Sequence, residues 1–195
     1  MSKPKNKDLH SEMNSIYNKL RAKKKKDWDR VLPLDELFSD RWEFAKYLNA
    51  KEGASVYHNS YIYGDVKIGK NTWIGPYTLL DGSGGGITLG DYVSISSGVH
   101  VYTHNVVKSM LSGGKIPYEK NKVKIGNNTY IGPYAIISMK GSIGNQCVIG
   151  AHSFVNSKIP DNSIAVGIPA KIVGKTIVKN NDVKLIYFKK RKSKK

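Results

Sequence analysis

The chain has 195 residues, enough for one domain with a sizeable buried core, and it carries a formal net charge of +17. Its one cysteine, Cys147, excludes an internal disulfide framework and has no partner cysteines for a metal site. No apolar run approaches the ~18 residues of a membrane helix, and the first ten residues lack the apolar segment of a signal peptide, so we expect a cytoplasmic protein.

The positive charge is concentrated at the two ends of the chain. Residues 1–26 contain nine Lys or Arg against Asp8 and Glu12, and residues 171–195 contain ten against Asp182. These basic arms are consistent with solubilising tails, with peripheral attraction to an anionic membrane or a polyanionic acceptor, or with binding to nucleic acid. No nucleic-acid motif accompanies the charge, so no nucleic-acid partner is expected.

The first 53 residues predict helices. Residues 3–26 form a polar helical pattern with one apolar stripe, made of Leu9, Met13, Ile16, Tyr17 and Leu20. Residues 28–51 predict a further helix with Asp35 or Ser39 as its N-cap, and its Leu, Phe and Trp side chains are sufficient to cover the open end of a repeat structure. We therefore expect residues 1–53 to be a basic helical arm and a helical cap.

From Ala54 onwards, apolar residues recur every six positions, and the residue two places before each is mostly small. The repeating positions are Val56, Ile62, Ile68, Ile74, Leu80, Leu89, Ile95, Val101, Ile125, Ile131, Ile137, Ile143, Ile149 and Val155. A period of six suits short strands with tight corners and does not suit a helix of 3.6 residues per turn. Hexapeptide repeats are typical of a parallel β-helix, and about fourteen hexads at three per coil predict nearly five coils.

Two segments interrupt the repeat. The phase slips by three residues across the glycine-rich segment 81–86, which lacks the Lys-Ser/Thr ending of a phosphate-binding loop and which we interpret as a bulged corner. A longer excursion at about 103–122 leaves the phase unchanged, because Val101 and Ile125 are 24 residues apart, a multiple of six. Loops of this length in a compact domain are usually functional.

The segment from Lys122 to Gly174, with its closing run AVGIPAK at 165–171, resembles the left-handed β-helix acyltransferases of the maltose/galactoside O-acetyltransferase and polysaccharide acetyltransferase type. The resemblance covers about residues 54–174. It implies a mainly β protein, with a left-handed parallel β-helix over 54–174 followed by a basic C-terminal tail at 175–195. It also implies a homotrimer with active sites between subunits.

The resemblance implies that His104, at the Thr-His step where the repeat gives way to the excursion, is the general base. In such enzymes the imidazole removes the proton of an acceptor hydroxyl or amine, which attacks the thioester of acetyl-CoA. A backbone N–H near a glycine corner would stabilise the oxyanion. Neither a covalent intermediate nor a metal is required.

The remaining candidate residues fall into two groups. Sugar hydroxyls are bound by carboxylates, amides and aromatic walls, and the side chains of this kind near His104 are Asp81, Tyr102, Asn105, Tyr118 and Glu119. Either Asp81 or Glu119 could orient His104, and the sequence does not decide between them. The resemblance places coenzyme A along the later coils, against Pro133, Ala151, Asn156, Lys158, Lys171 and Lys175.

We therefore expect an acetyl-CoA-dependent O-acetyltransferase that acts on a sugar, free or nucleotide- or lipid-linked, in surface polysaccharide or lipopolysaccharide synthesis. Three alternatives stay open. The first is an amino-sugar N-acetyltransferase. The second is a γ-carbonic-anhydrase-like zinc enzyme using His58, His100 and His104, although the spacing departs from that family. The third is a non-enzymatic scaffold with membrane- or nucleic-acid-binding arms, against which the excursion after His104 counts.

Overall fold

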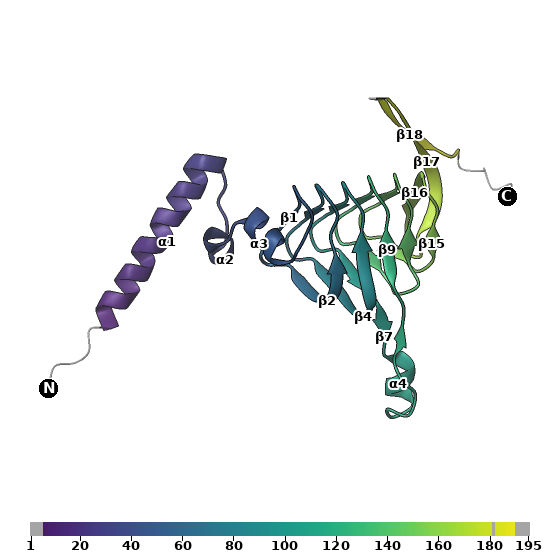
Figure 1. Ribbon diagram of the computed structural model, residues 1–195, viewed down its shortest axis with the longest axis horizontal. Helices are drawn as coiled ribbons and strands as arrows, with labels where there is room; N and C mark the ends of the chain where they lie inside the picture. The colour runs from purple at the N-terminus through teal and green to yellow at the C-terminus, as the bar shows by residue number, and fades with distance from the viewer. Residues whose placement is uncertain (1–5, 181, 190–195) are drawn as a thin grey trace, which may run out of the picture.

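The computed structural model describes residues 6–180 and 182–189, and places three helices before a parallel β-helix (Figure 1). The helices are α1 (Asn6–Trp28), α2 (Leu34–Phe38) and α3 (Arg41–Tyr47). The N-cap of α3 is Asp40, and not Asp35 or Ser39 as predicted, because the Asp40 carboxylate accepts the N–H groups of Trp42 and Glu43 at 3.0 Å each. Of the helices in the described part, none is both long and apolar enough to cross a membrane.

The mainly β fold and the parallel β-helix are confirmed. The first face contains β1 (Ser55–Val56), β3 (Trp73–Ile74), β5 (Ser94–Ile95), β10 (Tyr130–Ile131), β13 (Val148–Ile149) and β16 (Ser163–Val166), in that order. Partners on this face lie one turn apart, and for Ile131 and Ile149 this turn is three hexads long. The strand β16 begins a further turn beyond the nearly five that the hexad count predicts.

The second and third faces are joined, because β2 (Tyr61–Lys67) and β4 (Leu79–Leu89) each continue through the corner between them. The second face adds β6 (His100–Tyr102), β11 (Ile136–Ile137) and β14 (Phe154–Val155). The third face adds β9 (Val123–Ile125), β12 (Ser142–Ile143) and β15 (Lys158–Ile159). All of these pairs are parallel, so the equivalent corners of successive turns lie above one another.

The hexad positions form the core. Every predicted apolar position is buried except Ile62, which is half-buried in the first turn. The small positions two residues earlier are also turned inward. Two of their hydroxyl groups reach a carbonyl of the next turn: Thr72 donates to the Gly90 carbonyl at 2.8 Å, and Thr129 to the Gly144 carbonyl at 3.0 Å. The buried Thr78 hydroxyl has no hydrogen-bond partner among the described residues.

The glycine-rich slip is a bulge between adjacent turns. Gly64 pairs with Gly82 and Val66 pairs with Ile87, so β4 uses five residue steps where β2 uses two. The three extra residues equal the phase slip read from the sequence. The insertion lies immediately before the third face and next to the excursion.

Part of the expected basic tail at 175–195 is a strand hairpin. The strand β17 (Lys171–Lys179) pairs antiparallel with β16 and with β18 (Asp182–Tyr187), so the last described residues extend the first face as a hairpin. The sequence analysis did not predict this hairpin. Its basic residues are interspersed with β-branched and apolar ones such as Ile177 and Val178, a pattern that suits a partly exposed strand. The terminal run KKRKSKK lies outside the described residues after Lys189.

Candidate active site

The excursion is a β-hairpin that leaves the second face beyond β6. It consists of β7 (His104–Asn105), α4 (Val107–Leu111) and β8 (Glu119–Lys120), and it projects from the β-helix (Figure 1). The strands β7 and β8 are antiparallel, with His104 opposite Lys120. We call residues 103–122 the excursion hairpin.

Thr103 fixes the backbone immediately before His104. Its side chain is fully buried, its hydroxyl donates to the Asp81 carbonyl at 2.6 Å, and it accepts the N–H of Gly84 at 2.8 Å. A Cβ on Gly84 would lie 2.4 Å from the Thr103 carbonyl oxygen and 2.7 Å from the His104 Cβ. The bulge in β4 and the start of the excursion hairpin therefore approach each other closely enough to require glycine.

Asp81 lies beside the His104 imidazole. The distance from His104 Nδ1 to Asp81 Oδ2 is 3.5 Å, and Nδ1 is buried with no partner at hydrogen-bonding geometry. The other oxygen of Asp81 is held by Ser83, whose N–H donates to Oδ1 at 3.1 Å and whose hydroxyl donates to the same atom. A short movement would close the contact between Asp81 and Nδ1, and catalytic hydrogen bonds often tighten in this way when substrate binds. Nε2 is then the nitrogen left to accept a proton.

Glu119 has a different partner. Lys108 Nζ on α4 lies 2.7 Å from Glu119 Oε1, and this hydrogen bond holds the pKa of the Glu119 carboxyl below its usual range. The ion pair links the two sides of the excursion hairpin. It also occupies the carboxylate that could otherwise have turned toward His104.

A groove of about 460 Å³ lies between the excursion hairpin and the outer surface of the second face. It contains four predicted site residues, namely Tyr102, His104, Asn105 and Asn156. Sequence reasoning missed the rest of its lining, which is Val106, Ile136, Ser138, Met139, Lys140 and Phe154.

A signal for this groove was present in the hexads. Ile136 and Phe154 occupy outward positions directly before the inward Ile137 and Val155, where side chains that face solvent are usually polar. Two apolar outward residues on neighbouring strands indicate a covered or ligand-binding surface.

The other predicted acceptor contacts lie around His104. Tyr118 places its ring nearly parallel to His104, at 15°, with centroids 6.2 Å apart. The Tyr102 hydroxyl lies 3.1 Å from His100 Nδ1. The Asn105 side-chain oxygen accepts the Val107 N–H at 2.8 Å, so its amide NH₂ remains available to a ligand.

The residues predicted to bind coenzyme A are spread over the later turns. Pro133 and Ala151 lie at the corners that precede β11 and β14, at the opposite end of these strands from Ser138 and Asn156. The other three are exposed lysines: Lys158 is on β15, Lys171 pairs with Val166, and Lys175 pairs with Ser163 on the first face. The structure thus brings only Asn156 of this group into the groove with His104.

The three histidines of the zinc hypothesis do not form a cluster. His58 packs against Phe44 of the cap with ring centroids 4.8 Å apart, and His100 contacts Tyr102. Across residues 6–180 and 182–189, no three His, Cys, Asp or Glu side chains are grouped as a metal ion would require.

Comparison with known proteins points to acyl transfer. No protein-family model matches the chain. Over 105 residues it is 34% identical to the galactoside O-acetyltransferase of Escherichia coli K12, covering 53% of this chain and 49% of that protein. The chain spans about half the length of the curated relatives it matches.

Solved structures with the same fold give a similar result. A variant of AntD, an N-acyltransferase from Bacillus cereus in complex with dTDP and coenzyme A, is 27% identical with a TM-score of 0.56, over 70% of this chain and 89% of AntD. A hexapeptide-repeat containing acetyltransferase from Vibrio cholerae, complexed with acetyl coenzyme A, shares the fold with a TM-score of 0.58 at 21% identity, over 90% and 92% of the two chains. With its hexad core, the chain is similar to hexapeptide-repeat β-helix acetyltransferases in sequence and in fold.

Proposed function

We propose that this protein transfers the acetyl group of acetyl-CoA to a sugar hydroxyl, with His104 as general base. The observation that carries the proposal is the position of His104: it lines a 460 Å³ groove, and its Nδ1 atom faces the Asp81 carboxylate. Similarity to the galactoside O-acetyltransferase and to AntD, which was solved with coenzyme A, supports the choice of acyl donor.

The chemistry needs one proton acceptor. Nε2 of His104 takes the hydroxyl proton while the hydroxyl oxygen attacks the thioester carbonyl carbon. The tetrahedral intermediate then collapses, the C–S bond breaks, and the proton on the imidazolium passes to the leaving thiolate, giving an acetyl ester and free coenzyme A. General base catalysis of this kind contributes about 10²–10⁴-fold, and no step calls for a metal.

Asp81 is the residue to which we assign the orientation of the base. Its charge stabilises the imidazolium that forms during attack, and it holds Nδ1 protonated so that Nε2 faces the acceptor. Ser83 keeps the carboxylate in place through the opposite oxygen. Glu119 is paired with Lys108, so its role is to hold the shape of the excursion hairpin next to the acceptor.

The groove suits a sugar on one side and an acyl thioester on the other. Tyr102, Asn105 and Tyr118 surround His104 with hydroxyl, amide and aromatic groups of the kind that bind sugars. We place the pantetheine arm of coenzyme A along β11 and β14, from the corner of Pro133 and Ala151 toward Asn156. The exposed lysines 158, 171 and 175 are the candidates for its phosphates.

We assign the acceptor to surface polysaccharide or lipopolysaccharide synthesis on the cytoplasmic side, as a sugar that is free, nucleotide-linked or lipid-linked. We also propose a homotrimer, in which a neighbouring subunit covers the outer surface of the second face. The apolar outward side chains of Ile136 and Phe154 support this arrangement. Light scattering that gives a monomer at assay concentrations contradicts this part.

A second candidate is acetylation of an amine. The 27% identical AntD is an N-acyltransferase, and the same base could take a proton from an amino sugar. The difference between the two reactions lies in the acceptor atom and not in the acyl donor.

The test is thiol release from acetyl-CoA with a panel of free sugars, nucleotide-linked sugars and amino sugars. Products from active acceptors are then treated with hydroxylamine, which cleaves an acetyl ester and leaves an acetamide intact. Acceptor-dependent release of an ester supports the main proposal, and a stable amide supports the second candidate. Absence of release with every acceptor, together with absence of acetyl-CoA binding in calorimetry, overturns both.

A further inference from the structure

The arm helix α1 carries an uncovered apolar stripe. Leu9, Met13 and Ile16 are 61%, 58% and 49% exposed, and the half-buried Leu20 continues their line. Their spacing of four, three and four residues puts them on one face of the helix. In Figure 1, α1 stands apart from the β-helix, and α2 of the cap region packs against it.

Basic side chains border this stripe on both sides. At 3.6 residues per turn, Lys19 and Lys23 lie along one edge, with the acidic Glu12 between them, and Arg21 lies beyond the other edge. All four side chains are exposed. The helix sequence from Asn6 to Trp28 contains seven Lys or Arg against three acidic residues. An apolar stripe with basic borders and a polar back is the pattern of a helix that lies flat at a membrane surface.

We propose that α1 binds an anionic lipid surface, with Leu9, Met13 and Ile16 turned toward the acyl chains and the bordering Lys and Arg among the lipid phosphates. The inference concerns the arm alone and does not rest on the proposed acetyl transfer. It accounts for both features of the stripe, since the apolar side chains leave water and the basic ones gain counter-charges.

Other partners satisfy only one of these features. A nucleic acid would neutralise the lysines and leave the apolar stripe in water. A second α1 packed in parallel along the same stripe would cover the apolar residues but bring Lys19 and Lys23 close to the same residues of its neighbour. The charge of the borders therefore favours a polyanionic surface with an apolar interior.

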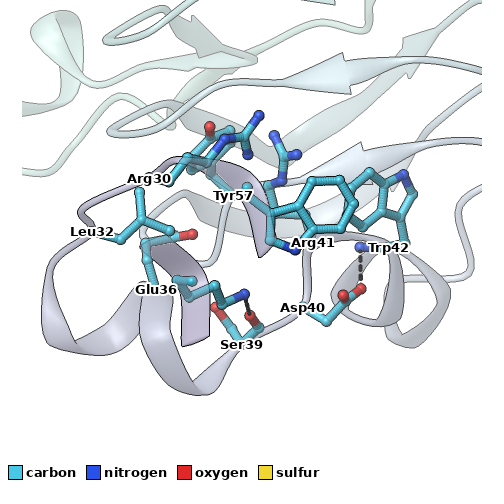
Figure 2. Close-up of a pocket in the computed structure, with 10 residues that line it drawn as sticks. Arg30, Leu32, Glu36, Ser39, Asp40, Arg41, Trp42 and Tyr57 are labelled. Carbon is cyan, nitrogen blue, oxygen red and sulfur yellow. Dashed lines mark hydrogen bonds between the residues drawn. The ribbon is translucent and has the colours of Figure 1, made fainter. Parts of the chain in front are cut away.

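The base of the arm is attached to the cap, so membrane binding would also orient the β-helix. Lys24 Nζ donates to the Ser39 carbonyl at 3.2 Å, and the Trp28 and Trp42 rings lie 6.0 Å apart. Figure 2 shows this joint, where Arg41 lies over the rings of both Trp42 and Tyr57, at 4.7 and 4.8 Å. The cavity left between these side chains is only about 30 Å³, too small for a sugar or a nucleotide, so we interpret the cluster as a joint.

The experiment is sedimentation of the full chain with vesicles of phosphatidylglycerol and phosphatidylcholine, compared with phosphatidylcholine alone. We expect binding to the anionic vesicles only, and weaker binding at high salt. The apolar variant Leu9→Ser/Met13→Ser/Ile16→Ser and the charge variant Lys19→Gln/Arg21→Gln/Lys23→Gln should each lower the partition coefficient at least ~10-fold.

A matched control removes the same charge from the body. The variant Lys70→Gln/Lys122→Gln/Lys179→Gln should bind vesicles like the wild type, because these exposed lysines lie outside the arm. Equal loss in the control and the arm charge variant would mean that net charge alone drives binding, and it would overturn the proposal. So would full binding by the apolar variant.

A fluorescent label establishes which face meets the lipid. An environment-sensitive dye on Met13→Cys should shift to the blue on anionic vesicles, whereas the same dye on Ser11→Cys, on the opposite face, should not; Cys147 is buried and does not compete for the dye. A blue shift of the Met13 label without vesicles that rises with protein concentration indicates self-association, and binding to RNA but not to vesicles indicates nucleic acid. Either outcome contradicts the proposal.

Discussion

The turns of the β-helix and the excursion hairpin are built differently. In the turns, an apolar side chain stacks on its equivalent one turn away, and corners repeat above one another. In residues 103–122, only Thr103 and Ser109 are buried, and the hairpin is held by one short strand pair and the ion pair of Lys108 with Glu119. The repeat therefore supplies rigid positions, while the break in the repeat supplies the polar side chains of the candidate site. His104 directly follows the fully buried Thr103.

The turns and the excursion hairpin should differ most in how much the truncation of a side chain lowers the free energy of unfolding. Ile131→Ala removes a fully buried side chain between Ile95 and Ile149 and should lower the free energy of unfolding by about 2–5 kcal/mol. Leu111→Ala, at an 86% exposed position on α4, should change it by less than ~0.5 kcal/mol. Chemical denaturation measures both, and similar costs at the two sites would mean that the excursion hairpin contributes to the core after all.

The next two substitutions distinguish displacement of His104 from backbone strain elsewhere in the excursion hairpin. Gly84→Ala inserts a methyl group against Thr103 and His104 and should lower kcat by ~10²-fold, because a displaced base loses its alignment with the acceptor. Gly113→Ala, at the hairpin tip with φ of +64° and nothing within 4 Å of the added Cβ, should cost some stability but leave kcat unchanged. Steady-state kinetics on both variants, with thermal melts as a control, would reveal a wrong assignment if the tip variant lost the activity instead.

A smaller effect is expected for the orienting carboxylate. Asp81→Asn preserves shape and removes the charge next to Nδ1, so kcat should fall at least ~10-fold with little change in KM. Glu119→Gln is the matched control, because it removes the charge of a carboxylate that is paired with Lys108 and not with His104. A larger loss of kcat in the Glu119 variant than in the Asp81 variant would reverse our assignment.

The smallest effect is expected for the reaction of the Cys147 thiol with a thiol reagent. Burial raises the pKa of the thiol, and its Sγ–H donates to the Asn145 and Pro160 carbonyls, so little thiolate forms and reagent has no access. We expect almost no reaction with a thiol reagent at pH 8 in the native protein and one equivalent in denaturant. Rapid labelling of native protein would show that the later turns open more readily than a continuous core allows.

Much of the scaffold could be predicted because its rule is local and repeated. The six-residue period identified the inward positions, and the three-residue slip at Asp81–Gly86 identified the bulge, since both are counts along the chain. The hairpin of β17 and β18 was not predicted, because its basic residues make the strand pattern hard to recognise. Asp40 was not identified as the N-cap of α3, because several neighbouring residues are also good N-caps.

The site could be predicted only in part. The break in the repeat and the family resemblance predicted His104 as a candidate, and that assignment stays a prediction. Our choice between Asp81 and Glu119 depends on a partner, Lys108, that lies eleven residues from Glu119. The groove wall formed by Ile136, Met139 and Phe154 depends on which corner of the prism the excursion hairpin covers. The pairing of side chains and the covering of one surface by a hairpin depend on tertiary contacts, and they leave no periodic pattern in the sequence.

The most direct test is acceptor-dependent thiol release from acetyl-CoA by the wild type, His104→Ala and the control His58→Ala, whose imidazole packs on the cap away from the groove. We predict that His104→Ala keeps the thermal melt and oligomeric state of the wild type and loses at least ~10²-fold in kcat, while His58→Ala keeps its turnover. Full turnover by a folded His104→Ala protein would contradict the central claim that this imidazole, placed at the break in the repeat, is the base.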